Sequence, residues 1–275
     1  MSSVSIQQLP PPRYVPMTLD YYLPIGITVI IVSIAVIIIL IIILLLVLRA
    51  YRYASTEIKT SILMFGLLCV MWMFSFIFLF SAAFSTLLLG TNKAPSEYII
   101  SINPYFGILM GFFGLFWNLS AAVMFIMGSH SYRGGINWVR DGIILGIAII
   151  AGVIGFLPEA RWGYLAIDPG AKLCSFTIGI STILYLLGFL WTGFPLLLRR
   201  KKEANPVRRR IFFRFALGLI MIVFASILFT TGFGAARTGP YAFRTPPIFS
   251  WIPISIGAIL FAVGVGLLYF SFTRY

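Results

Sequence analysis

The chain has 275 residues, of which 60% are apolar and only 10% are charged, and its formal net charge is +13. Soluble domains have about 25% charged residues, so this composition excludes an ordinary water-soluble globular protein. The mean hydropathy of +1.03 agrees with that exclusion and indicates a membrane protein.

Continuous apolar stretches fill most of the sequence. Seven of them run over residues 24–48, 61–89, 105–127, 142–157, 173–198, 211–233 and 248–272. Each is long enough, or nearly long enough, to cross a bilayer, which takes about 20 residues of a transmembrane helix. A transmembrane barrel would show strands of about ten residues with alternating polarity. The pattern therefore predicts an all-α, polytopic bundle of seven transmembrane helices. Residues 1–23 are expected to form a short extracytoplasmic tail, and residues 24–275 a single transmembrane domain.

The first stretch, from Pro24 to Leu48, consists almost entirely of Ile, Leu and Val. A helix that is apolar on every face can contact lipid all round. This helix is therefore expected at the periphery of the bundle.

The third stretch contains two kinds of packing signal. Small residues recur at four-residue intervals at Gly107 and Gly111, and the spacing returns at positions 142 and 146 and at positions 262 and 266. Such pairs let helices approach closely, within one chain or between two copies. Asn118 and Ser120 lie midway along the same stretch and are the candidate intramembrane polar contact. Their partner is expected to be a neighbouring helix or a bound ligand.

The fourth stretch is the weakest, because Gly142 to Leu157 spans only about 24 Å at 1.5 Å per residue. A short or tilted helix is expected here. Arg140 and Asp141 precede it and, being adjacent, point about 100° apart on a helix. They therefore need not pair.

The connection between the fifth and sixth stretches is the most polar part of the chain. Its cations are Arg199, Arg200, Lys201, Lys202, Arg208, Arg209 and Arg210. They are interpreted as a topology determinant that contacts anionic lipids, or as a docking site for a cytoplasmic or membrane protein or for a phosphoinositide-like head group. Asn205-Pro206 is expected to break the helix there. Pro195 and Pro253 are expected to kink the fifth and seventh helices.

Five of the six tryptophans lie at or near predicted span ends, which is typical of an aromatic belt at the headgroup level. These are Trp117, Trp138, Trp162, Trp191 and Trp251. Trp72 lies in the middle of a span, where packing in the core or against lipid is expected.

The distribution of cations predicts the orientation. With the N-terminus outside, 14 Lys and Arg residues fall in inner segments and six in outer ones. The positive-inside rule therefore places the N-terminus outside and the C-terminus inside. The basic charge is explained by topology, so nucleic acid is not an expected partner.

The sequence lacks the residues that metal binding and acid–base catalysis need. His130 is the only histidine and is expected in a solvated loop, and the two cysteines are far apart along the chain. A catalytic zinc site needs about three protein ligands. The acidic and basic groups that catalysis uses are also missing at membrane depth. The sequence therefore predicts no enzyme activity, no metal and no cofactor.

In its layout the chain resembles the seven-helix N-terminal sensor region of some prokaryotic histidine kinases. The shared features are the outside N-terminus, the basic loop before the sixth span, and a final span that ends in residues 269–275 (YFSFTRY). The resemblance implies a sensor, here expected without an output domain.

The expected function is that of a multi-pass sensor or scaffold, in the plasma membrane, that acts through contacts at its basic cytoplasmic face. The alternatives are a carrier or channel for a neutral or lipidic solute, and an accessory subunit of a larger membrane complex. Ligand, partner and oligomeric state are not predicted.

Overall fold

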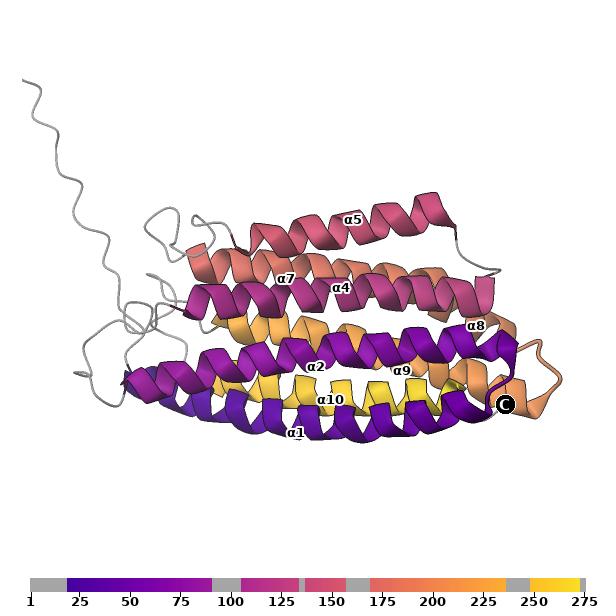
Figure 1. Cartoon of the computed structure of the whole chain (residues 1–275), viewed down its shortest axis with the longest axis horizontal. Helices are drawn as coiled ribbons and strands as arrows, with labels where there is room; N and C mark the ends of the chain where they lie inside the picture. Colours follow the sequence, from indigo (N-terminus) through magenta and orange to yellow (C-terminus); the bar gives the residue numbers. More distant parts are fainter. Residues whose placement is uncertain (1–18, 91–104, 134–136, 157–168, 236–247, 273–275) are drawn as a thin grey trace, which may run out of the picture.

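The computed structural model describes residues 19–90, 105–133, 137–156, 169–235 and 248–272, and these are helical almost throughout. The elements are α1 (Leu19–Tyr53), α2 (Thr56–Gly90), α4 (Phe106–Arg133), α5 (Trp138–Ile154), α7 (Pro169–Gly188), the π-helical η1 (Phe189–Gly193), α8 (Phe194–Arg200), α9 (Pro206–Ala235) and α10 (Ile248–Phe272). Because α7, η1 and α8 are continuous, the described residues form seven helical rods (Figure 1). The all-α prediction is confirmed.

Six of these rods are long and apolar enough to cross a membrane, which indicates a multi-pass membrane protein. They contain α1, α2, α4, α7–α8, α9 and α10. The remaining rod, α5, has 17 residues. The first helix begins at Leu19, so residues 19–23 of the predicted tail belong to α1. Residues 1–18 of that tail lie outside the described ranges.

The six long rods form a closed ring. Each packs against two neighbours in the order α1, α2, α4, α7–α8, α9, α10 and back to α1. The short α5 packs outside this ring, against α4 and α7 (Figure 1). α1 buries the smallest share of its span among the six, as its all-round apolar sequence predicts. Its outer face exposes a row of Ile and Leu side chains.

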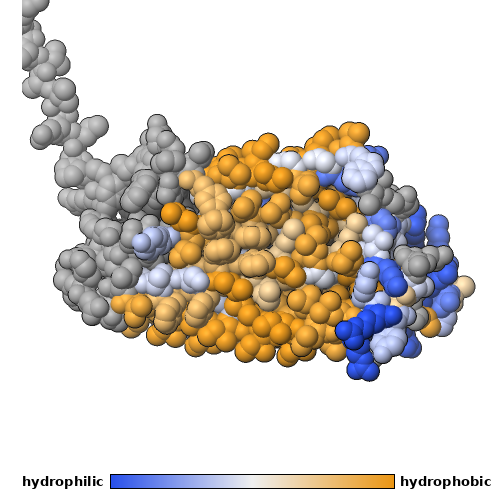
Figure 2. Space-filling view, viewed as in Figure 1, coloured by the Kyte–Doolittle hydropathy of each residue, from blue (hydrophilic) through white to orange (hydrophobic). Residues whose placement is uncertain are grey.

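The surface is divided along the length of the bundle. A broad apolar belt covers the middle, and hydrophilic residues gather at the end where α1 finishes and α8 meets α9 (Figure 2). We call this the basic end. The ends of α1 and α4, the starts of α2 and α5, and the α8–α9 connection all lie there (Figure 1). Alternate connections of the chain thus reach the same end of the molecule.

Glycines mark the closest helix contacts. A Cβ on Gly111 of α4 would lie 3.2 Å from the Gly155 carbonyl oxygen, and one on Gly218 of α9 would lie 2.9 Å from the Gly264 carbonyl oxygen of α10. The expectation that small residues pack within the chain is confirmed for Gly111. At Gly142, Gly146 and Gly266 no other part of the described chain comes within 4 Å of a Cβ built there, so these three do not mark a contact within the described chain.

Substitutions at two glycines of α5 test how closely α5 packs on α4. A Cβ on Gly152 would lie 2.8 Å from the Leu115 Cα of α4 and would also clash with the Leu115 side chain, whereas Gly146 faces open space. We expect Gly152→Ala to lower the free energy of unfolding by about 1–3 kcal/mol, the usual cost of overpacking. Thermal unfolding in detergent measures the change.

The control is Gly146→Ala on the same helix, which removes the same backbone freedom without a clash. We expect it to leave stability unchanged or slightly raised, since alanine is the better helix former. Equal effects of the two substitutions would contradict the close packing of α5 on α4.

Candidate functional site

The two polar residues predicted in the third span lie in the interior of the bundle. Asn118 and Ser120 are both on α4 and fully buried. The Asn118 Nδ2 donates to the Gly114 carbonyl oxygen one turn earlier, at 2.8 Å. The Ser120 hydroxyl lies 2.6 Å from the Tyr185 hydroxyl of α7. Of the two kinds of partner expected for this pair, Ser120 therefore has a neighbouring helix.

Tyr185 is the centre of a hydrogen-bond chain. The Trp72 indole N–H of α2 donates to the Tyr185 oxygen at 2.9 Å. The Ser120 hydroxyl donates to the Trp117 carbonyl oxygen at 2.7 Å, so it accepts from the Tyr185 hydroxyl. The chain thus runs in one direction from α2 through α7 to α4. Each donor along it has an acceptor, as buried polar groups require.

A second group of polar contacts lies beside the first. The Trp117 indole nitrogen lies 3.4 Å from the Ser226 hydroxyl of α9. That hydroxyl is 2.7 Å from the Thr182 hydroxyl of α7, and Thr182 also lies 3.3 Å from the Thr230 hydroxyl. Together the two groups connect four of the six helices of the ring.

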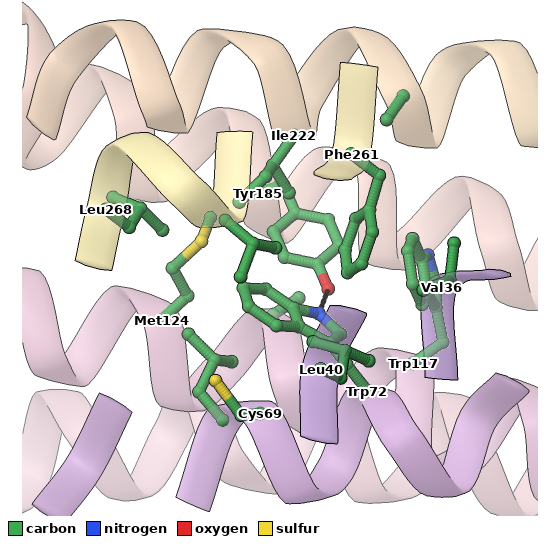
Figure 3. Packing of buried hydrophobic residues seen from close by; sticks show 14 of the residues in the cluster. Val36, Leu40, Cys69, Trp72, Trp117, Met124, Tyr185, Ile222, Phe261 and Leu268 are labelled. Atoms are coloured by element: carbon green, nitrogen blue, oxygen red, sulfur yellow. Dashed lines mark hydrogen bonds between the residues drawn. The ribbon is translucent and has the colours of Figure 1, made fainter. Parts of the chain in front are cut away.

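Aromatic rings fill the space around these contacts. The Trp117 ring has its centroid 5.6 Å from those of Tyr185, Phe229 and Phe261, and Trp72 meets Phe261 edge to face at 4.9 Å. Figure 3 shows Tyr185, Trp72 and Phe261 converging from different helices. We call Trp72, Trp117, Ser120, Tyr185, Phe229 and Phe261 the central cluster. It is a packed structural centre.

The belt prediction is wrong for Trp117, which is fully buried in this cluster. Trp72 is in the core, one of the two packings expected for it. Trp138, 84% exposed at the start of α5, has the exposure expected of a belt residue. Trp162 and the side chain of Trp251 lie outside the described residues. Tyr185 was not among the residues predicted from the sequence. Its position in the middle of an apolar stretch was the available signal, because a buried tyrosine hydroxyl needs a hydrogen-bond partner.

An ion pair between Arg140 and Asp141 stabilises the start of α5. The Arg140 Nε donates to the Asp141 Oδ1 at 2.7 Å. Asp141 also accepts from the Asn137 backbone N–H, while the Asn137 side chain accepts from the Arg140 N–H. This reciprocal cap turns the Asp141 carboxylate back along the helix, towards the flexible Arg140 side chain. The sequence left pairing between these two residues open, and in the structure they pair.

The guanidinium of Arg140 also fastens α5 to its neighbours. It lies 5.7 Å from the ring of Phe125 on α4 and 5.8 Å from the ring of Trp191 on η1. These two rings stack on each other at 6.2 Å. A cation close to aromatic faces is attracted by their quadrupoles.

His130 lies in the last turn of α4, half-buried, and not in a solvated loop. Gly128, two residues earlier on α4, faces Thr192 of η1. A Cβ built on Gly128 would lie 2.9 Å from the Thr192 hydroxyl oxygen. Within the described ranges, no three His, Cys, Asp or Glu side chains lie together in an arrangement that holds a metal.

The seven predicted docking cations lie at the basic end. Arg199 and Arg200 end α8, Lys201 and Lys202 follow in a turn, and Arg208, Arg209 and Arg210 lie in the first turns of α9. All are exposed except Arg200, which is half-buried with its guanidinium 4.2 Å from the Phe213 ring centroid. None of the seven forms an ion pair with a carboxylate of the described residues.

The break predicted at Asn205-Pro206 is confirmed, since α8 ends at Arg200 and α9 begins at Pro206. The Asn205 side chain accepts from the backbone N–H groups of Val207 and Arg208, at 2.9 and 3.3 Å. Pro206 takes the first helical position, where a missing N–H costs nothing. The cap fixes the direction in which α9 leaves the connection.

Comparison with known proteins finds no matching family model, no matching curated protein and no matching solved structure. The class that the fold defines is a multi-pass, all-α membrane protein with a packed aromatic centre and one basic end.

Tyr185→Phe tests the central cluster. The substitution keeps the ring but removes the hydroxyl that accepts from Trp72 and donates to Ser120. Hydrogen bonds between membrane helices average about 0.6 kcal/mol, and a buried donor left without an acceptor costs more. We expect a loss of about 1–2 kcal/mol in the free energy of unfolding, measured by denaturation in detergent.

The matched control is Tyr53→Phe, because Tyr53 is 83% exposed at the end of α1. It should leave stability within about 0.5 kcal/mol of the wild type, as surface substitutions usually do. If Tyr185→Phe is as mild as this control, the hydrogen-bond chain contributes nothing to the bundle.

Proposed function

We propose that this chain is a seven-span protein of the plasma membrane that acts without catalysis, as a sensor or scaffold, through protein contacts at its basic end. The N-terminus lies outside and the C-terminus inside in this proposal. The observation that carries it is the dense group of exposed cations between α8 and α9, none of which has a carboxylate partner in the described chain.

The course of α5 supports the proposal that this helix is the seventh membrane span. This helix starts at the basic end, where α4 finishes, and runs towards the opposite end beside α4 and α7 (Figure 1). Its 17 residues extend over about 26 Å at 1.5 Å per residue, near the lower limit for a spanning helix.

The orientation rests on the distribution of charge. Cations such as Arg49, Arg52 and Arg140 share the basic end with the α8–α9 connection. Cytoplasmic loops carry the excess of Lys and Arg in multi-pass proteins, so the basic end is assigned to the cytoplasm. An acidic surface on a cytoplasmic or membrane protein is the complementary partner.

Replacing Arg208, Arg209 and Arg210 together with Ala tests the proposal. All three are exposed and lie beyond the packed core, so membrane insertion and thermal stability should be retained. We expect a stoichiometric protein partner to be lost. The measurement is native mass spectrometry of the protein extracted gently from its own membrane.

The control replaces three cations at the same end, Arg49, Arg52 and Lys59, with Ala. These lie at the junction of α1 and α2, and the partner should remain bound to this variant. A partner retained by both variants, or no stoichiometric partner on the wild-type protein, would overturn docking at the α8–α9 connection.

A further inference from the structure

A row of exposed apolar side chains leads along one helical rod to the basic end. Leu186 on α7, Leu190 on η1, and Phe194 and Leu198 on α8 are 42%, 50%, 47% and 54% exposed. The four are spaced four residues apart. We call them the lipid-facing row. It covers about 18 Å of helix at 1.5 Å per residue, somewhat more than half of the about 30 Å hydrocarbon core.

Cations follow this row without interruption. Arg199 is the next residue after Leu198, and Arg200, Lys201 and Lys202 come directly after it. An apolar surface about as long as one leaflet is deep therefore ends in four positive side chains. An anionic phospholipid is complementary to this surface, because its acyl chain matches the apolar row and its phosphate matches the cations.

Arg200 is held in place before any ligand binds. Its guanidinium lies 4.2 Å from the ring centroid of Phe213 on α9, and Phe213 itself is 37% exposed. Stacking restrains the long arginine side chain, so less conformational freedom is lost when the guanidinium binds a phosphate. A planar guanidinium can also donate two hydrogen bonds to one phosphate.

We propose that an anionic phospholipid of the leaflet at the basic end binds here, with an acyl chain along the lipid-facing row and its phosphate at Arg199 and Arg200. The site is distinct from the protein-docking cations Arg208, Arg209 and Arg210 and does not depend on a protein partner. A soluble acidic partner would have no use for the apolar row. The combination of row and cations therefore selects a lipid.

Native mass spectrometry tests the proposal. The full-length protein is released from vesicles that contain equal amounts of phosphatidylglycerol and phosphatidylcholine, and the lipids that stay bound are counted. We expect retained phosphatidylglycerol on the wild-type protein. Each cation near an anionic surface contributes about fivefold in affinity, so Arg199→Ala with Arg200→Ala should weaken phosphatidylglycerol binding about 30-fold.

The control is Arg49→Ala with Arg52→Ala. These two exposed arginines follow the exposed Leu45 and Leu48 at the same end of the bundle, on α1. The control should lose less than about fivefold in phosphatidylglycerol binding, one cation's contribution. Equal losses in the two double variants, or no loss in either, would show general electrostatic attraction only and would overturn the site.

Two further measurements separate the lipid from simpler explanations. Inorganic phosphate, added in excess, should not displace the retained phosphatidylglycerol; full displacement would show that the acyl chain contributes nothing and would overturn the proposal. Arg200→Lys keeps the charge and disturbs the protein least. This variant therefore replaces the double variant in the binding measurement if the double variant does not fold. It should weaken binding by less than the double variant but measurably, because the stacked, two-pronged donor is lost.

Discussion

Helices in a bilayer gain little hydrophobic energy from touching each other, because the lipid they leave is as apolar as the helix they meet. Close packing and internal hydrogen bonds must hold such a bundle together. In this protein both are concentrated around the Tyr185 hydroxyl, which joins α7 to Trp72 and Ser120, residues 113 and 65 positions away in the chain. The six long helices surround that centre, and the aromatic side chains of Trp117, Phe229 and Phe261 fill the space around it.

α5 is attached by a different means. It contributes no residue to the central cluster. Its inner face buries Ala148 and Ala151, and it has further contacts near its two ends. At the basic end, Arg140 pairs with Asp141 and lies against Phe125 and Trp191. At the other end, Gly111 allows close approach to Gly155 and Phe156. Gly142 and Gly146 lie on the face of α5 that no other part of the described chain covers, and α5 packs outside the ring against α4 and α7.

The positions of the helices were predictable because each depends on a local run of apolar residues, and the predicted boundaries differ from those of the structure by six residues at most. Packing partners were not predictable in the same way. Trp117 and Trp138 are the same residue type, yet one is in the core and the other is exposed, since their depth and direction depend on helices far away in the sequence. Arg140 and Asp141 pair because a cap turns one side chain back, and helix angle alone does not contain that information. Asn205-Pro206, whose effect is local, was predicted correctly.

The π-helical segment η1 changes the rotational register of the rod it interrupts. Pro195 has no N–H to donate, and the Phe194 N–H reaches back to the Phe189 carbonyl oxygen, five residues earlier. In a regular α-helix, residues four apart drift by about 40° per step, or about 120° over three steps. A wider turn rotates each residue less, so the single π turn offsets part of that drift. Leu186 and Leu198 thereby stay nearer to one side of the rod, and the π turn that precedes Pro195 changes the direction in which Arg199 and Arg200 face.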